Sequence, residues 1–531
     1  MLLTRRAFAK TAAGAAFAAA MPLRHPRAAT DTKTLRFIPQ SDVQVLDPIW
    51  TTAYVSRNHG YMVFDTLFAI DSKFKPHPQM VGEFEVSADK LNYKFALRDG
   101  LKFHDGQPVR GADCVASIKR WMARDALGQT MATAIADMKG GDDKNFSIQL
   151  KEPFSLLIDG LAKVSSLAPF IMPERLAKTD PFQQVSEMVG SGPFKFVKEE
   201  HQPGNKLVYV KNNDYVPRSE PADWASGGKV VKVDRVEWHV VPDIATKTAA
   251  MQNGEDDWWE NPPADIWPVL AANQDIEVIP ADAIRAMGCL RFNFLYPPFD
   301  NVKIRQAVMM VASQADFMTA FVGDKKNWDV CAGYFTCGGP MASDAGSQIL
   351  TGKRDYEAAK ALIKEAGYKG EKIILLDAVD QPLIHAEALV ATDFMKKLDL
   401  NVEYTAADWG SVVTRRASKK APADGGWNMF ETGWVGSDLL DPSTNVMLRA
   451  NGDKAWFGWP KDDQLEQLRS EWLKARDIEE RQEIAAKLQQ RAFEFVPYVP
   501  TGQFEAKTAF RKDVKGVRPA PAFFMWGVEK T

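Results

Sequence analysis

Aromatic and acidic side chains gather in three short stretches of this chain, a combination that suits the binding of a small polar solute. An indole face offers contact area and attracts cations, and a buried carboxylate anchors an ammonium group. The same residues could instead be core aromatics and acids that cap solvated loops, although 15 tryptophans exceed what a core alone requires. The candidate ligand-binding residues are Trp258, Trp259, Glu260, Tyr334, Phe335, Glu431, Trp434 and Asp438.

Sequence motifs of enzymes and metal sites are absent. The chain has no His-Glu-x-x-His, Gly-x-Ser-x-Gly or phosphate-binding Gly-x-x-x-x-Gly-Lys-Ser/Thr pattern, and its seven histidines are scattered. His104, in Phe-His-Asp-Gly, suits a turn better than a metal site, because no second ligand lies at a suitable spacing. We therefore expect no metal, no cofactor and no enzymatic activity. The alternative is a periplasmic hydrolase whose catalytic triad forms only in the folded protein.

Two of the four cysteines are close in sequence. Cys331 and Cys337 lie in Cys-Ala-Gly-Tyr-Phe-Thr-Cys, a spacing that in an oxidising compartment favours a disulfide closing a small loop. Cys114 lies on the face of an expected helix and Cys289 in an apolar strand, so we expect both to be buried thiols.

Strand and helix patterns alternate along the chain, which predicts a mixed α/β protein in which helices cover sheets. The run 231–241 is β-branched and alternating, as in a buried strand, and a helix is expected at 244–253, ending at Gly254. At 531 residues the chain is too long for one core, so two or three lobes are expected. Further strands are expected at 35–39, 93–97, 146–150, 194–197, 207–210, 372–376 and 402–404, and further helices at 112–123, 355–366, 384–398, 462–474 and 478–495.

The segment 189–216 is the most specific part of the sequence. It reads Val-Gly-Ser-Gly-Pro-Phe-Lys-Phe-Val, then a Pro-Gly turn, then Lys-Leu-Val-Tyr-Val-Lys-Asn-Asn-Asp-Tyr-Val. This string resembles a signature of the family 5 bacterial extracellular solute-binding proteins, the dipeptide-, oligopeptide- and nickel-binding periplasmic subunits of ABC transporters. Segments similar to four further motifs of that family follow one another at 64–68, 97–109, 298–307 and 355–368.

The resemblance implies an α/β periplasmic binding protein fold, in which two main lobes close about a hinge like a Venus flytrap and a small third lobe is inserted. Lobe I would then comprise residues 30–68, 189–284 and 501–531, lobe II residues 69–188 and lobe III residues 285–500, with hinge crossings near 280–285 and 500–504. The implied function is capture of a peptide-like or small amine-bearing solute and its delivery to the permease and ATPase of an ABC importer. A binding protein that serves only a chemoreceptor is an alternative.

The resemblance also assigns a role within the second aromatic stretch. Peptide-binding members carry an Asp three residues before an Asp-Pro pair, and that Asp holds the peptide amine. Here the pair is Asp441-Pro442, so the matching residue is Asp438, whereas counting from Trp434 gives Ser437.

The carboxylate end of a peptide is expected to be held differently. In dipeptide-binding members an arginine at the start of the helix matching 384–398 binds the carboxylate. This chain has His385 or a neighbour at that place and no arginine. Arg415 or Arg416 could substitute, or both could be ordinary surface residues.

The N-terminus predicts export. Residues 4–10 read Thr-Arg-Arg-Ala-Phe-Ala-Lys and precede an Ala-rich run, 11–21, that is too short to span a bilayer. A short amphipathic helix at a cytosolic terminus is the alternative, but we expect residues 1–29 to be a twin-arginine signal peptide. The first cysteine is Cys114, so no lipid anchor is expected and the mature protein should be free in the periplasm.

The overall charge excludes some partners. The full chain carries a net charge of −3, and residues 1–29 contain bases and no acid, so the remainder is more acidic. This balance disfavours nucleic acid and anionic membrane surfaces as partners. The acidic balance also favours a cationic or zwitterionic ligand. We expect a monomer whose partners are a small solute, peptide-like or cationic or zwitterionic, and the permease and ATPase complex of an ABC transporter.

Overall fold

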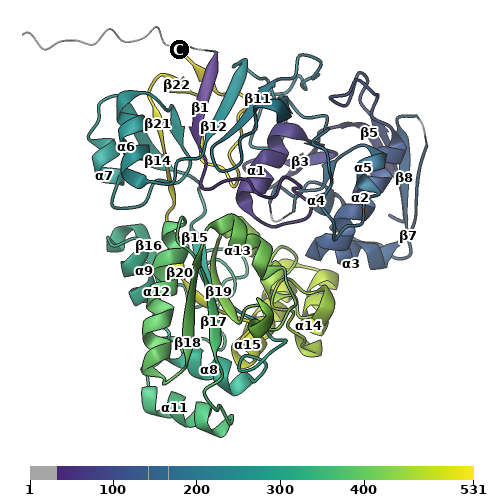
Figure 1. The fold of residues 1–531 in the computed structure, drawn as a ribbon. Helices are drawn as coiled ribbons and strands as arrows, with labels where there is room; N and C mark the ends of the chain where they lie inside the picture. Colours follow the sequence, from purple (N-terminus) through teal and green to yellow (C-terminus); the bar gives the residue numbers. More distant parts are fainter. Residues whose placement is uncertain (1–32, 142, 166) are drawn as a thin grey trace, which may run out of the picture.

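The computed structural model describes residues 33–141, 143–165 and 167–531. The expected signal peptide, residues 1–29, lies outside the described residues. Three sheets carry the fold (Figure 1), of seven, four and six strands, and we call the parts built on them lobe I, lobe II and lobe III. The protein is mixed α/β, as the sequence pattern predicts, whereas the residue boundaries of the lobes stay a prediction.

Lobe I is organised around strand β1 (Thr34–Ile38), which is buried and pairs in parallel with its neighbours β12 and β13. The strand expected at 231–241 is shorter in the structure, because β1 and β11 both pair with β12 only from Arg235 onwards. The strands in sheet order are β10 (Phe194–Phe196), β11 (Lys206–Lys211), β12 (Arg235–His239), β1, β13 (Trp258–Trp259), β21 (Lys507–Arg511) and β14 (Ile276–Pro280).

Among the described residues, the α-helices of lobe I are α1 (Tyr54–Val63), α6 (Ile244–Asn253) and α7 (Trp267–Ala271). Helix α6 has the bounds expected from its sequence. Its first turn is capped by the Asp243 side chain, which accepts from the Thr246 N–H, and it ends at Gly254, whose φ of 76° suits glycine. The α6 N-terminus is thereby fixed beside the place where the lobes meet.

Lobe II is a four-stranded antiparallel sheet packed against helices (Figure 1). Helix α2 (Gly111–Arg124) begins with a reciprocal contact between Arg110 and Asp113 and buries Val115, Ile118 and Trp121. The strands in sheet order are β5 (Val81–Val86), β6 (Asn92–Leu97), β8 (Asn145–Leu150) and β7 (Ile135–Gly140), and the other helices are α3 (Ala126–Ala134), α4 (Leu157–Leu161) and α5 (Glu174–Ala177).

Lobe III contains the six-stranded sheet. Its strand β17 (Ile373–Ala378) is buried along its whole length, which is typical of a strand covered on both faces. The other strands are β16 (Trp328–Asp329), β20 (Tyr498–Phe504), β15 (Ala286–Phe292), β19 (Met429–Trp434) and β18 (Val402–Ala407). The main helices are α8 (Val302–Val311), α9 (Gln314–Phe321), α11 (Tyr356–Glu365), α12 (Pro382–Lys397), α13 (Trp409–Arg416), α14 (Asp463–Lys474) and α15 (Ile478–Phe495).

Two crossings join lobe I to lobe III. The first is residues 281–285, between β14 and β15, and the second is residues 505–506, between β20 and β21. The crossings are held together, since the Ala281 N–H donates to the Ala506 carbonyl at 2.8 Å. The second crossing lies later than expected, because β20 continues to pair with β15 as far as Phe504.

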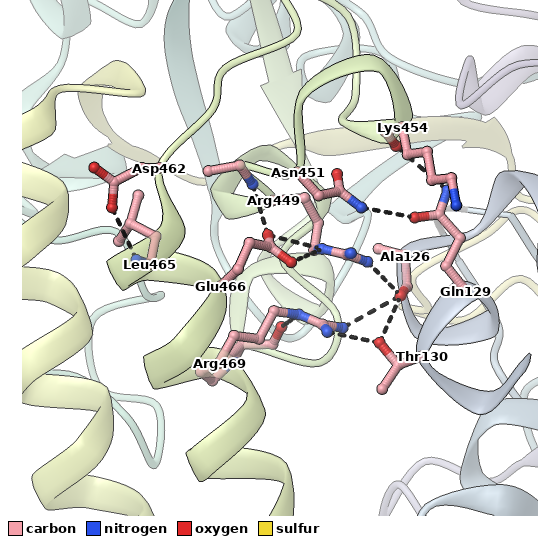
Figure 2. A network of polar contacts seen from close by, with 12 residues as sticks. Ala126, Gln129, Thr130, Arg449, Asn451, Lys454, Asp462, Leu465, Glu466 and Arg469 are labelled. Atoms are coloured by element: carbon pink, nitrogen blue, oxygen red, sulfur yellow. Dashed lines mark hydrogen bonds and ion pairs between the residues drawn. The ribbon is translucent and has the colours of Figure 1, made fainter. Parts of the chain in front are cut away.

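Lobe II also contacts lobe III directly, through a group of polar contacts that we call the latch (Figure 2). Arg449 donates to the Ala126 carbonyl at 2.7 Å and pairs with Glu466 at 3.1 Å. Arg469, on α14, donates to the Thr130 hydroxyl at 2.7 Å and to the Ala126 carbonyl at 3.3 Å. The latch therefore connects helix α3 with lobe III independently of the two crossings.

The cysteines lie in lobes II and III. Cys331 and Cys337 are joined by a disulfide in lobe III, and Cys114 and Cys289 are buried free thiols. Within the described residues, no helix is both long and apolar enough to cross a membrane.

Candidate ligand-binding site

A cavity of about 940 Å³ lies beside the two crossings, with walls from lobes I and III. A cavity of this size accommodates a small organic solute. Lobe I contributes Tyr54, Arg57, Lys247, Trp259 and Glu260, and lobe III contributes His385, Trp409, Arg416, Trp434 and Phe504.

Three of the eight residues singled out from the sequence line this cavity: Trp259, Glu260 and Trp434. Trp258 is not among the lining residues, because successive side chains of β13 point to opposite faces of the sheet. Its ring packs on Phe37, with ring centroids 5.2 Å apart, and its indole N–H donates to the Thr508 hydroxyl at 2.7 Å. Trp258 is therefore a core residue.

Tyr334 and Phe335 belong to the lobe III core and do not line the cavity. The Tyr334 ring stands edge-on to Tyr498, with centroids 4.8 Å apart, and its hydroxyl is 3.1 Å from the carbonyls of Ala492 and Tyr498. The disulfide loop that carries these two residues is thus part of the interior, and the expectation that it faces a ligand is not met.

Glu431 is fully buried in strand β19, and neither of its carboxylate oxygens has a hydrogen-bond partner in the part of the chain that the structure describes. Burial raises its pKa well above the usual range, and the nearby acids Glu387 and Asp377 raise it further. Glu431 therefore lies in the lobe III interior and is not among the residues that line the cavity.

Glu260 forms part of the lobe I wall. Its carboxylate accepts from the Gln40 N–H at 2.6 Å and from the Asn58 side-chain amide at 2.9 Å. Burial raises the pKa of Glu260 to about 7, although these hydrogen bonds and the positive charge of Arg57 oppose the effect. Both carboxylate oxygens of Glu260 already accept a hydrogen bond from the protein. Glu260 therefore makes the wall of the cavity polar, but neither of its oxygens is an empty acceptor for a ligand.

Asp438 lies behind Tyr54 and is not among the lining residues. Its Oδ2 accepts from the Tyr54 hydroxyl at 2.7 Å and from the Ser165 hydroxyl at 3.0 Å. The Tyr54 oxygen in turn accepts from the Val435 N–H at 2.8 Å. Burial raises the pKa of Asp438, while Arg57 lowers it. Oδ2 of Asp438 therefore already accepts two hydrogen bonds from the protein.

A family model for the bacterial extracellular solute-binding proteins, family 5, matches residues 75–456 of this chain. The chain belongs to family 5. A probable peptide ABC transporter periplasmic-binding protein of Sinorhizobium fredii is 39% identical over 534 residues, which cover 100% of both chains. The glutathione-binding protein GsiB of Pectobacterium atrosepticum is 26% identical over 400 residues, covering 74% of this chain and 72% of that protein.

Solved structures share the periplasmic binding protein fold of this family 5 chain. The binding protein AgaA from A. tumefaciens R10, in complex with agropinic acid, has a TM-score of 0.78 at 23% identity, covering 94% of this chain and 99% of that one. A dipeptide-binding protein from Pseudoalteromonas sp. SM9913, in complex with Met-Leu, has a TM-score of 0.75 at 18% identity, covering 94% and 100%. The expected fold class is confirmed.

Two of the basic residues weighed for a carboxylate in this family 5 protein do line the cavity, namely His385 and Arg416. His385, on α12, lies with its Nδ1 2.8 Å from an oxygen of Asp377, so one ring nitrogen is already engaged. Arg415 instead donates to the carbonyls of Gly425 and Gly426 and is not among the lining residues. Successive side chains of helix α13 point in different directions, so Arg416 lines the cavity and Arg415 does not.

Sequence reasoning missed Arg57 and Lys247. Arg57 is buried in α1, with its guanidinium 4.3 Å from the Tyr54 ring centroid and 2.5 Å from the Ser165 hydroxyl. Lys247 lies on α6, and burial lowers its pKa although Asp380 and Glu260 oppose the effect. Neither residue belongs to a recognisable sequence motif. Each lies at the cavity because of the direction in which its helix presents the side chain and because of how the lobes pack.

Proposed function

We propose that this chain is the substrate-binding protein of an ABC importer and that it binds a small peptide-like or amine-bearing solute between lobes I and III without chemical change. The observation that carries the proposal is the cavity beside the two crossings, which both lobes line. Membership of a solute-binding family, and a full-length relative described as a probable peptide ABC transporter protein, support it. A permease is the partner that would receive the solute.

Native mass spectrometry tests the proposed binding. Protein prepared from the periplasm is expected to carry a small solute that leaves on denaturation, and ligand-free protein should take up components of a casein hydrolysate. The masses of the bound and recovered solutes should be equal, since no bond is made or broken. Retention of no solute from either source contradicts the proposal, and a recovered product that differs from the bound compound favours an enzyme.

Closure of the lobes is part of the proposed function. A permease must distinguish loaded from empty protein, so the two states need different shapes. Rotation about residues 281–285 and 505–506 would separate lobe III from lobe I. Solution scattering should therefore show a smaller radius of gyration with solute than without it. An unchanged scattering curve at saturating solute contradicts the hinged mechanism.

Export to the periplasm through the twin-arginine route is proposed from residues 1–29. Replacement of Arg5 and Arg6 together by Lys should leave uncleaved protein in the cytoplasm, because recognition of this signal depends on the arginine pair. Cell fractionation measures the result, with Arg24→Lys as a control for a change of the same kind elsewhere in the segment. A normal periplasmic level of the double variant contradicts this route.

A further inference from the structure

The disulfide loop, residues 331–337, is bonded to a short 3₁₀ helix, η4 (Gly436–Leu439). The hydroxyl of Thr336 donates to the Gly436 carbonyl at 2.7 Å, and its backbone N–H donates to the Leu439 carbonyl at 3.0 Å. Thr336 is 2% exposed, so water does not compete for these hydrogen bonds. One residue of the loop therefore holds both ends of η4.

η4 is a part of lobe III that contacts both other lobes. Its residue Asp438 accepts from the Tyr54 hydroxyl of lobe I at 2.7 Å and from the Ser165 hydroxyl of lobe II at 3.0 Å. The N–H of Val435, directly before η4, donates to the Tyr54 oxygen at 2.8 Å. Tyr54 and Val435 line the cavity. The position of η4 therefore decides whether this contact between the lobes can form beside the cavity.

η4 depends on its neighbours for that position. A 3₁₀ helix of four residues is too short to be stable through its own hydrogen bonds, and no side chain caps it. The buried hydroxyl of Ser437 has no partner in the part of the chain that the structure describes. On Gly436 a Cβ would lie 2.3 Å from Cγ2 of Ile284, so η4 also packs tightly against the first crossing. The disulfide loop and this crossing hold η4 where it lies.

The ends of the disulfide loop are fixed in turn. The Gln314 side chain accepts from the Cys331 N–H at 2.8 Å and donates to the Cys331 carbonyl at 2.8 Å. The Cys337 N–H donates to the Gln503 side chain at 3.1 Å. Since the disulfide joins Cys331 to Cys337, the segment between them has few conformations available. Thr336 directly precedes Cys337, so this closure restricts its position.

We propose that Thr336 is a positioning residue for solute binding: held by the Cys331–Cys337 disulfide, it fixes η4 so that Asp438 can join the three lobes. This inference rests on the proposed solute-binding function. Thr336 is not among the residues that line the cavity, so it acts through η4 and not by contact with the solute. The disulfide then serves the affinity for solute as well as the stability of lobe III.

Substitution of Thr336 tests this role. The measurement is the retention of casein-hydrolysate components by ligand-free protein, read by native mass spectrometry at a limiting amount of hydrolysate. Thr336→Val removes one hydrogen bond at nearly constant shape and should lower retention about fivefold, whereas Thr336→Ser keeps the hydroxyl and should retain normally. Thr392→Val is the matched control, because the hydroxyl of this buried threonine on α12 has no partner among the described residues.

Combination with Asp438→Asn separates positioning from a general loss of stability. If Thr336 acts through Asp438, the Thr336→Val, Asp438→Asn double variant should retain as much as Asp438→Asn alone, because both changes remove the same contact. Urea denaturation gives the free energy of unfolding of each variant alongside its retention. Losses of retention that multiply in the double variant would make Thr336 a structural residue and overturn the proposal.

Reduction of the disulfide tests its part without a substitution, and it decides the question if Thr336→Val does not fold. Cys337 is exposed, so dithiothreitol can reach the bond, and two protein thiols form as the reductant closes to its own cyclic disulfide. The reduced protein should stay folded by circular dichroism and retain severalfold less hydrolysate. The Cys331→Ala, Cys337→Ala double variant should show the same low retention with and without the reductant.

Two results would overturn the proposal directly. Normal retention by folded Thr336→Val would mean that its hydroxyl does not position η4 for binding, and normal retention by the reduced wild type would mean that the disulfide does not. A wild type that retains nothing from the hydrolysate overturns the proposed function itself, which is a separate result.

Discussion

Lobe III directs arginines at its neighbours in two regions, the latch and the cavity, and the two regions use the same residue type differently. At the latch, Arg449 and Arg469 donate to the Ala126 carbonyl and the Thr130 hydroxyl of lobe II (Figure 2). At the cavity, Arg416 has aromatic rings around it and one long contact to Thr52. A cation whose donors are satisfied by the protein holds lobes together, and one whose donors are unmet is available to a ligand.

The largest expected effect concerns a buried acid, Glu387, which extends the comparison of buried charges. A buried carboxylic acid can become neutral by binding a proton, whereas a guanidinium stays charged. Burial raises the pKa of Glu387 to about 8, and among the described residues only the Thr501 hydroxyl donates a hydrogen bond to it, at 2.5 Å. Glu387 therefore binds its proton more tightly in the folded protein than in the unfolded chain. The free energy of unfolding should fall as pH rises from the unfolded pKa, near 4.5, through 8.

Glu387→Gln removes this pH dependence. The difference in unfolding free energy between wild type and variant should change by roughly 4 kcal/mol from pH 4.5 to pH 8.5, with the wild type losing stability relative to the variant. Urea denaturation at several pH values measures it, and the exposed Asp393→Asn on the same helix is the control. A difference that does not vary with pH would mean that Glu387 has the same pKa in the folded protein as in the unfolded chain.

The second prediction concerns a substitution that weakens the latch. Arg469→Gln removes donors to the Thr130 hydroxyl and the Ala126 carbonyl, which favours separation of lobes II and III. Affinity for casein-derived solutes should fall about tenfold, or about 1.4 kcal/mol, because the closed form is less populated. The selection among these solutes should remain unchanged, since Arg469 is not among the residues that line the cavity. A changed selection in Arg469→Gln would erase the distinction between latch and cavity.

The third prediction concerns Asp438, which joins all three lobes through Tyr54 and Ser165. Asp438→Asn should lower affinity severalfold, since it weakens the hydrogen bonds that join the three lobes beside the cavity. The same factor is expected for free and N-acetylated solutes in calorimetric titrations. A loss confined to solutes with a free amine would instead assign Asp438 the amine-binding role expected from the family motif.

The smallest expected effect is on the stability of the ligand-free protein. Arg416→Gln should change the free energy of unfolding by less than about 1 kcal/mol, because few hydrogen bonds are lost and an unpaired buried charge is removed. Arg291→Gln, which strands the carbonyls of Met447 and Pro497, is the matched comparison and should destabilise the protein several times more. Equal losses in urea denaturation would make Arg416 a structural residue.

Local signals predicted much of the fold. Helix α6 follows from its Asp243 cap and Gly254 stop, and the second half of the α14–α15 pair has the bounds expected from its periodicity. The second crossing and the start of β12 could not be placed, because both depend on where partner strands begin and end. Pairing between strands far apart in sequence is not encoded in the local pattern.

The sequence predicted the residue types of the candidate site better than it predicted which individual residues line the cavity. Alternation along β13 sends Trp259 to the cavity and Trp258 to the core, but the sequence does not reveal which face is which. For Arg415 and Arg416 on helix α13, the sequence likewise does not reveal which of the two side chains faces the cavity. Tyr334 was singled out as an aromatic residue on a short loop, but its ring packs on Tyr498 in the lobe III interior.

The two crossings have a consequence for how this protein could change during evolution. Lobe III is one uninterrupted segment whose ends meet, since Ala286 pairs with Phe504 and Ala281 bonds to Ala506. A single exchange of coding DNA would therefore replace the whole lobe, together with Arg416, Trp434 and His385, and leave the lobe I wall in place. Recombination at these two points offers a direct route to a new solute, because half of the cavity is inherited as one piece.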